Sequence, residues 1–229
     1  MPLILLLLAC VALAAVWLPG WWVRRTMAHY SQPRDRYFGS GAMLARHLLD
    51  QRGLSDVKVE ETKAGDHYDP AARAVRLSEG NYSSHSLTAI TVAAHEVGHA
   101  IQHAEGYTPL RMRERLVGLA LAGQRLGSLI MLAAPVIALM ARHPVPGLLF
   151  VVAGLLSLGL AAVVHIVTLP TEFDASFRRA LPMLEQGGYL HAADRPHARR
   201  ILKAAALTYV AQSLMSLLNI AAWLRFLRR

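Results

Sequence analysis

Residues 84–104 read SHSLTAITVAAHEVGHAIQHA, and this stretch predicts a buried helix. Its apolar residues recur at helical spacing: Leu87, Ile90, Val97 and Ile101. We expect Ser84 to cap the start of this helix, and Gly106 with Pro109 to end it. No charged residue other than Glu96 interrupts the stretch, as a helix buried on most sides requires.

The helix carries the motif His95-Glu96-Val97-Gly98-His99. Residues four apart lie on one face of a helix, separated by a rise of ~6 Å, so two imidazoles at this spacing can bind one metal ion. Glu96 lies beside them and can take a proton from a metal-bound water. The alternative interpretation is a core helix with two incidental histidines.

A hydrolytic zinc site needs a third protein ligand and keeps its fourth position for water. His103 lies on the same helix but ~12 Å from His95 along the axis, too far to share an ion. Glu172 opens a later helix, after Pro170 and Thr171, and is the predicted third ligand. The alternative for Glu172 is a helix-start carboxylate that interacts favourably with the helix dipole.

The segments before the motif predict a small α+β region. Residues 41–51 favour a short helix that stops at Gly53. Residues 57–60 and 74–77 alternate in polarity like strands, with a run rich in turn formers at 66–70, so a small hairpin is expected.

The composition is apolar, with 54% hydrophobic and 17% charged residues, and the apolar residues are clumped into runs of nearly spanning length. We therefore predict a mostly α membrane protein, with about four transmembrane helices and a small α+β zincin-like catalytic domain at one membrane face. The expected parts are a transmembrane helix over 1–23, a first catalytic part over 24–115, a transmembrane hairpin over 116–169, a second catalytic part over 170–203, and a transmembrane or interfacial helix with a basic tail over 204–229.

Charge and cysteine content exclude other classes of protein. The net charge is +9, but the basic residues flank the apolar runs, which is typical of membrane topology and argues against nucleic-acid binding. Because basic residues near span ends favour the cytoplasm, the active site is expected on the cytoplasmic face. The single cysteine, Cys10, excludes an all-thiolate zinc site.

Three motifs together carry a resemblance to a known family: residues 95–100 (HEVGHA), 66–70 (DHYDP) and 169–176 (LPTEFDAS). From about Tyr37 to Tyr209 the chain resembles the bacterial family of membrane neutral zinc metallopeptidases. The resemblance implies a membrane-embedded gluzincin of the bacterial plasma membrane, distantly similar to the heat-shock membrane metalloproteases and the CAAX prenyl proteases. By that similarity His95, His99 and Glu172 match the ligands of one Zn²⁺ per chain, and Glu96 matches the catalytic base.

The sequence departs from the wider gluzincin pattern at one position. Those enzymes usually place an aspartate four residues after the glutamate ligand, where it orients a histidine ligand, and here that position is Ser176. Asp174 would point away on a regular helix. Either irregular geometry at the helix start recruits Asp174, or another carboxylate such as Asp66 or Asp69 serves.

Two further parts of a hydrolase are expected elsewhere. Residues 74–77 precede the motif helix, as the substrate-pairing edge strand does in zincin folds. A donor for the oxyanion is also needed, and the candidates follow Glu172 in the chain: His197, Arg200 and Tyr209.

The predicted function is zinc-dependent hydrolysis of peptide bonds. Glu96 would deprotonate the zinc-bound water, which attacks a carbonyl polarised by the metal, and would then pass the proton to the leaving amine. The expected partners are a peptide or membrane-protein substrate and the lipid bilayer, and an endopeptidase is favoured over an exopeptidase. The alternative is a non-catalytic zinc-binding membrane scaffold or adaptor, although such a protein has no use for Glu96.

Overall fold

The structure, a computed structural model, describes residues 2–142, 145, 147–153, 156 and 167–208. The chain divides into two compact units. One unit comprises Met1–Gly20, Met112–Thr168 and Tyr209–Arg229, and the other, the sheet-containing unit, comprises Trp21–Arg111 and Leu169–Thr208.

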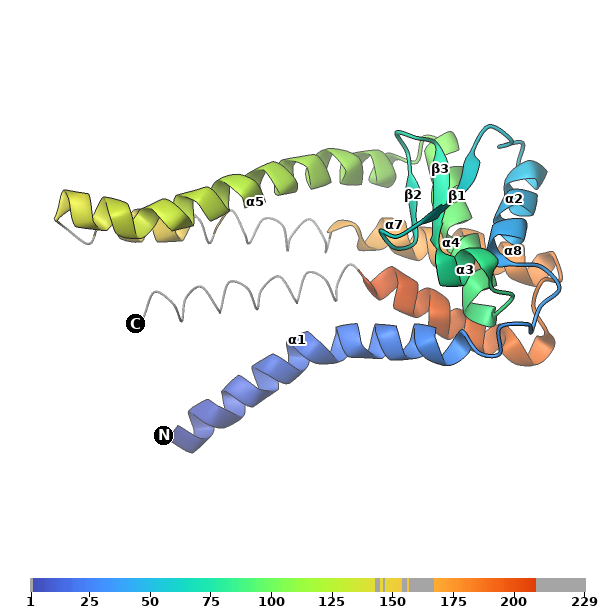
Figure 1. The fold of residues 1–229 in the computed structure, drawn as a ribbon, viewed down its shortest axis with the longest axis horizontal. Coiled ribbons are helices and arrows are strands. Elements are labelled where there is room, and N and C mark those ends of the chain that lie inside the picture. Colours follow the sequence, from blue (N-terminus) through green and yellow to red (C-terminus); the bar gives the residue numbers. More distant parts are fainter. Residues whose placement is uncertain (1, 143–144, 146, 154–155, 157–166, 209–229) are drawn as a thin grey trace. The chain divides into compact units, whose positions relative to one another are not determined.

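The two longest helices each contribute to both units. Helix α1 spans Pro2–Tyr30 and helix α5 spans Thr108–Ala141 (Figure 1). Helix α1 continues past the predicted boundary at residue 23 through two arginines, and α5 begins with a charged turn and carries Arg125 in its interior. The helices therefore do not coincide with the uncharged runs that suggested membrane spans.

The predicted fold with about four transmembrane helices is wrong for the described part of the chain. Among the described residues, no helix combines the length and the apolar character that crossing a bilayer requires. The prediction counted apolar runs, some of them lengthened by flanking residues, as spans, whereas both helices contain charged residues: Arg24 and Arg25 in α1, and Arg125 in α5. The turn of the predicted hairpin and most of residues 204–229 lie outside the described residues. The fold that the structure supports is a mostly helical α+β fold with a three-stranded sheet.

The sheet has the strand order β1-β3-β2, with β1 at Lys58–Thr62, β2 at His67–Asp69 and β3 at Ala74–Ser78. Strand β3 pairs with β1 in parallel and with β2 antiparallel. The predicted hairpin between residues 57–60 and 74–77 is therefore wrong, because the turn formers at 66–70 contain a strand of their own. Asp69 closes the turn between β2 and β3 by accepting hydrogen bonds from the N–H groups of Ala71 and Ala72.

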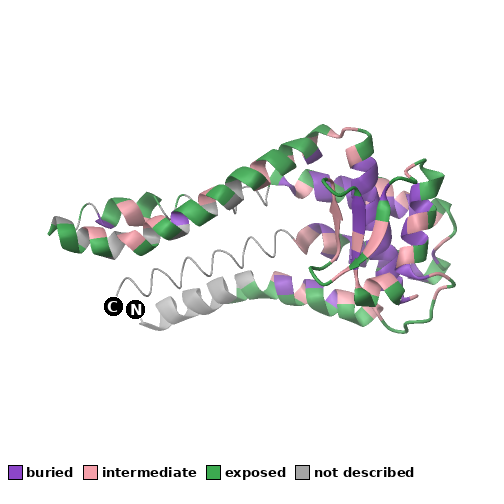
Figure 2. Cartoon of the chain, turned by 45° about the horizontal axis from the view of Figure 1, so that its top comes forward, coloured by how far each residue is buried: buried purple, intermediate pink, exposed green. Residues whose placement is uncertain are grey.

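Helix α4 (Leu87–Ala104) lies at the centre of the sheet-containing unit (Figure 1). Every residue from Leu87 to Gln102 is buried, and Figure 2 shows that the buried residues gather in the part of the chain that contains the sheet. Helix α4 packs against β3, helix α2 (Gly41–Gln51) and helix α8 (Leu181–Gln186). Its N-cap is Ser86, whose hydroxyl accepts a hydrogen bond from the N–H of Ala89; the predicted cap, Ser84, instead binds the N–H of Ser86.

Two more elements complete this unit. The short helix α3 (Glu79–Ser83) joins β3 to α4, and the single turn η2 (Ala192–Asp194) precedes a helix over residues 195–208. The side chains that fill the core come from α2, α4, β3, α8 and this last helix, including Leu48, Leu77, Val97, Leu184 and Leu202.

Helix α7 (Leu169–Phe173) continues without a break into η1 (Asp174–Ala180), a π-helical segment, and then into α8. A π-helix has a wider turn than an α-helix, is rare, and frequently occurs at functional sites. Segment η1 packs directly against α4. The two elements that carry the sequence motifs therefore lie side by side.

Candidate metal centre

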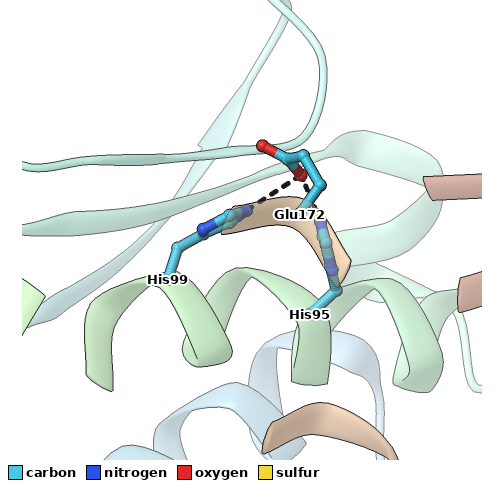
Figure 3. Close-up of side chains that lie close together, drawn as sticks. All are labelled: His95, His99 and Glu172. Atoms are coloured by element: carbon cyan, nitrogen blue, oxygen red, sulfur yellow. Dashed lines mark hydrogen bonds and ion pairs between the residues drawn. The ribbon is translucent and has the colours of Figure 1, made fainter. Parts of the chain in front are cut away.

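Three atoms that can bind a metal ion converge between α4 and α7 (Figure 3). The Nε2 atoms of His95 and His99 lie 3.3 and 3.2 Å from the same oxygen, Oε2 of Glu172. The two imidazole rings are 4.8 Å apart between centroids and inclined by 77°. All three side chains are buried, and Glu172 has no exposed surface. Among the described residues, this is the group of histidine and carboxylate ligands that fits one ion.

The donor set and its spacing fit a zinc ion. Nitrogen and oxygen ligands bind zinc at about 2.0–2.1 Å in a tetrahedral arrangement, which places neighbouring ligand atoms about 3.3 Å apart. The distances from Glu172 to the two histidines match that separation. A fully buried carboxylate beside two imidazoles also needs a compensating positive charge, because an isolated buried charge is costly. Two histidines and one glutamate leave the fourth position of a tetrahedral ion to water.

The centre depends on a close approach of two backbones. A Cβ atom on Gly98 would lie 2.8 Å from the carbonyl oxygen of Ala175, so only glycine permits this contact between α4 and η1. Ala175 is itself completely buried. Its neighbours Asp174 and Ser176 lie on either side of the contact, each within reach of a different part of α4.

Gln102 contacts His99 from one turn further along α4. Its Oε1 lies 2.9 Å from Nδ1 of His99, and its Nε2 donates to the carbonyl oxygen of Thr171 at 2.9 Å and to Oδ2 of Asp174 at 2.8 Å. Gln102 is completely buried. The side chain therefore joins the second ligand histidine to the helix that carries Glu172.

Ser176 contacts the other histidine. Its hydroxyl lies 3.0 Å from Nδ1 of His95 and donates to the carbonyl oxygen of Leu202 at 3.2 Å. This is the position where gluzincins usually have an aspartate. Both carboxylates considered as replacements are engaged elsewhere: Asp66 accepts hydrogen bonds from Ser78 and Asn81, and Asp69 from the turn before β3 and from Arg76.

Asp174 is held by Arg179, one turn along the π-helix. The guanidinium donates from Nε to Oδ2 of Asp174 at 2.7 Å, and its Nη1 lies 2.8 Å from Oε2 of Glu105. Burial alone would lower the pKa of Arg179, but its hydrogen bonds to Asp174 and Glu105 outweigh burial and raise that pKa above its ordinary value. Arg179 therefore stays charged beside Asp174.

The remaining predicted residues lie elsewhere or are only partly described. Glu96 lies on α4 next to His95 and is 6% exposed. His103 faces the sheet, where its Nδ1 is 2.8 Å from the hydroxyl of Tyr68. His197 is exposed and its Nδ1 lies 3.0 Å from the hydroxyl of Tyr30, and Arg200 is also exposed. Tyr209 lies outside the described residues. The role of His197, Arg200 and Tyr209 as oxyanion donors stays a prediction.

The strand expected to pair with substrate has no free edge along most of its length. Strand β3 is the central strand, paired with β1 from Ala74 to Ser78 and with β2 from Ala74 to Arg76. The prediction that residues 74–77 form an edge strand is therefore wrong. Its basis was the position of the strand directly before the motif helix, and position in the chain does not determine strand order in a sheet.

A family model described as "Putative neutral zinc metallopeptidase" matches residues 4–228. The chain belongs to this family. The resemblance drawn from the three sequence motifs is thereby confirmed. The chain is also 36% identical over 200 residues to the "Putative membrane protease YugP" of Bacillus subtilis (strain 168), an alignment that covers 86% of this chain and 85% of the relative. No solved structure matches it.

For this member of the zinc metallopeptidase family, sequence reasoning missed Gln102. The available signal was its position three residues after His99, which places the two side chains on neighbouring positions of one helix face. Ser176 was identified as a departure from the gluzincin pattern, but its contact with His95 depends on η1, which no periodicity predicts.

Proposed function

We propose that this member of the neutral zinc metallopeptidase family hydrolyses internal peptide bonds, using one zinc ion held by His95, His99 and Glu172. The observation that carries the proposal is the buried cluster itself, in which three ligand atoms lie within 4.8 Å of one another. The family match supports zinc as the ion and a peptide as the substrate.

When bound, zinc would supply acidity to a water in its open fourth position and would polarise the substrate carbonyl. Glu96 is the residue that handles the proton. It accepts the proton that the attacking water loses as the new C–O bond forms, and it returns that proton to the amine nitrogen as the C–N bond breaks. Glu96 is buried, at 6% exposure, beside the ligand His95 on α4.

The test uses a quenched fluorescent peptide blocked at both ends, so that only an endopeptidase releases a signal. Glu96→Gln should retain about one zinc per chain while cleavage falls by ~10²-fold or more, the scale of losing a general base. Glu172→Ala should lose both zinc and cleavage. Glu185→Gln is the matched control, because Glu185 lies on α8 and pairs with Arg199, away from the cluster. It should behave like the wild type.

Undiminished cleavage by Glu96→Gln would refute the assigned mechanism. A wild-type protein that binds zinc but cleaves no member of a blocked-peptide library would instead support the alternative, a non-catalytic zinc-binding scaffold. A zinc-free wild type would refute the metal centre itself.

We also propose that the protein works at a bacterial plasma membrane, with its site exposed to the cytoplasm. The Bacillus subtilis relative, which is named as a membrane protease, supports membrane association, and the basic residues that flank the apolar runs support the cytoplasmic side. Membrane association is checked by cell fractionation, and recovery of the full chain in the supernatant of a high-speed spin would refute it.

A further inference from the structure

We propose that Gln102 and Ser176 are positioning residues that hold His95 and His99 in the tautomer with hydrogen on Nδ1, so that both Nε2 lone pairs are ready for zinc. This inference rests on the proposed function, because it concerns the same centre. It rests on the hydrogen-bond partners of two polar side chains that have no exposed surface, Gln102 and Ser176.

The amide of Gln102 determines the tautomer of His99. Its Nε2 has two hydrogens, and both are donated, one to the carbonyl oxygen of Thr171 and one to Oδ2 of Asp174. Both of those partners can only accept. The group facing His99 is therefore Oε1, which is also only an acceptor. Nδ1 of His99 must then carry the hydrogen, which leaves Nε2, on the side that faces Glu172, as the atom available to zinc.

The hydroxyl of Ser176 favours the same tautomer of His95. It lies within hydrogen-bond distance of the carbonyl oxygen of Leu202, which can only accept, and of Nδ1 of His95. A serine has one hydrogen to donate, so both contacts are hydrogen bonds at once only when the hydroxyl donates to Leu202 and Nδ1 of His95 donates to the hydroxyl. Nε2 of His95 then remains as the metal-binding atom, 3.3 Å from Oε2 of Glu172.

Both acceptors are neutral, which distinguishes this centre from a site with a carboxylate directly on a ligand histidine. A carboxylate acceptor makes a ligand imidazole more basic. The carboxylate present here, Asp174, does not contact a histidine directly. It accepts a hydrogen bond from the amide of Gln102, which in turn contacts His99, and its charge is balanced by Arg179. The geometry therefore assigns Asp174 to orienting Gln102.

The direct test is the tautomer in metal-free Glu172→Ala protein, in which the carboxylate that faces both Nε2 atoms is absent. Nitrogen-15 NMR of histidine-labelled protein at about pH 8, above the ordinary pKa of an imidazole, distinguishes Nδ1–H from Nε2–H rings. With Gln102 and Ser176 intact, this protein should show His95 and His99 as Nδ1–H. In this background Gln102→Met, which keeps the length of the side chain, should turn His99 into a mixture of tautomers, and Ser176→Ala should do the same to His95 alone.

The second test is zinc affinity, measured by competition with a chelator of known affinity. Each variant should bind zinc about 10–100-fold more weakly, the usual cost of losing such a partner. Thr88→Val is the matched control: it removes a buried hydroxyl of α4 that donates to the carbonyl oxygen of Met27, away from the ligands. Its zinc affinity should equal that of the wild type, and in the Glu172→Ala background it should leave both tautomers unchanged.

Unchanged tautomers and unchanged zinc affinity in both variants would overturn the inference. A loss of zinc affinity equal to that of Thr88→Val, with tautomers unchanged, would overturn it as well, since it would show a general effect of destabilising α4. If Gln102→Met does not fold, the tautomer of His95 and the zinc affinity of the Ser176→Ala variant decide whether the inference holds. If instead Glu172→Ala binds zinc as tightly as the wild type, the proposed function fails, while the tautomer measurement in metal-free protein still tests this inference.

Discussion

Gly98 shows how a single absent carbon sets the distance between two helices. Where α4 meets η1, the contact is between the backbone of Gly98 and the backbone of Ala175, and a backbone cannot rotate aside as a long side chain can. The contacts of Asp174 with Gln102 and of Ser176 with His95 flank this point. Gly98 is therefore a condition for both hydrogen bonds, although it touches no ligand atom.

Gly98→Ala should weaken zinc binding and destabilise the fold together. The added Cβ lies 2.8 Å from the oxygen of Ala175, so α4 and η1 must separate, at a cost of about 1–3 kcal/mol in unfolding free energy. Urea unfolding and chelator competition measure the two effects.

The control for this substitution is Gly118→Ala in α5, where an added Cβ meets no atom within 4 Å. Alanine favours helix over glycine by up to about 1 kcal/mol, so this variant should be slightly more stable than the wild type. A Gly98→Ala protein with wild-type stability and zinc affinity would contradict the importance of the close contact.

At this scale the candidate ligands could be predicted, because helical spacing is enough to place His95 and His99 on one face. The partners of their outer nitrogens could not be predicted in the same way. Ser176 reaches His95 across 81 positions of sequence, through a backbone geometry that no spacing rule describes. Gln102 could have been found, since it lies on the same helix as its partner.

Asp174 and Ser176 both contact α4 from segment η1, one on each side of Ala175. Because Ala175 faces α4, the two side chains contact different turns of that helix. The irregular geometry considered for Asp174 from sequence is present, but it brings Asp174 to Gln102 instead of to a histidine.

Helices α2 and α4 could be predicted from sequence, because their apolar residues recur every three or four positions and their ends carry caps. The order of the strands could not, because alternation identifies a strand and not its neighbour. The membrane spans were mispredicted because uncharged runs were counted as complete helices, while α1 and α5 extend into charged sequence.

Asp194, the last residue of η2, bonds to the segment that follows α1. Its carboxylate, 3% exposed, accepts hydrogen bonds from Nε and Nη2 of Arg36 at 2.7 and 2.8 Å and from the hydroxyl of Tyr37 at 2.5 Å. Burial alone would raise the pKa of Asp194, but the hydrogen bonds from Arg36 and Tyr37 outweigh burial and hold that pKa below its usual range. The folded state thus favours the ionised carboxylate.

We therefore expect the stability of the protein to fall on acidification, and Asp194→Asn to reduce that dependence. The contribution of Asp194 is fully present above its unfolded pKa of about 4 and is lost as the pH falls through the lower, folded value. Urea unfolding of the wild type and the variant between about pH 7 and pH 3 measures the free energy of unfolding of each protein at each pH. The Asp194→Asn variant should be less stable near neutrality, by about 1–3 kcal/mol, and the difference should narrow below about pH 4. A constant difference across this range would contradict the assignment.

On the scale of the whole molecule, the metal centre joins two segments that are distant in the sequence. His95 and His99 belong to the segment Trp21–Arg111, and Glu172 belongs to Leu169–Thr208. An ion bound by all three therefore crosslinks the sheet-containing unit. Because an unfolded chain does not hold the three ligands together, zinc binding stabilises the folded state.

Removing the metal should lower the melting temperature of the wild type. At a free zinc concentration of about 100 times Kd, binding contributes about 2.7 kcal/mol, and a chelator removes that contribution. Glu172→Ala, which lacks one ligand, should respond much less, while Glu185→Gln should respond like the wild type. Equal chelator effects on Glu172→Ala and the wild type would place the metal elsewhere.

The separation of the ligands along the chain also has a consequence for biosynthesis. A ribosome that has completed the first segment has made the helix with both histidines and Glu96, but not Glu172. The nascent chain at that stage lacks the third candidate ligand and does not yet contain the whole centre. The proposed peptidase activity would therefore begin only after the second segment has emerged and folded against the first, so an unfinished chain has no complete centre with which to cleave itself.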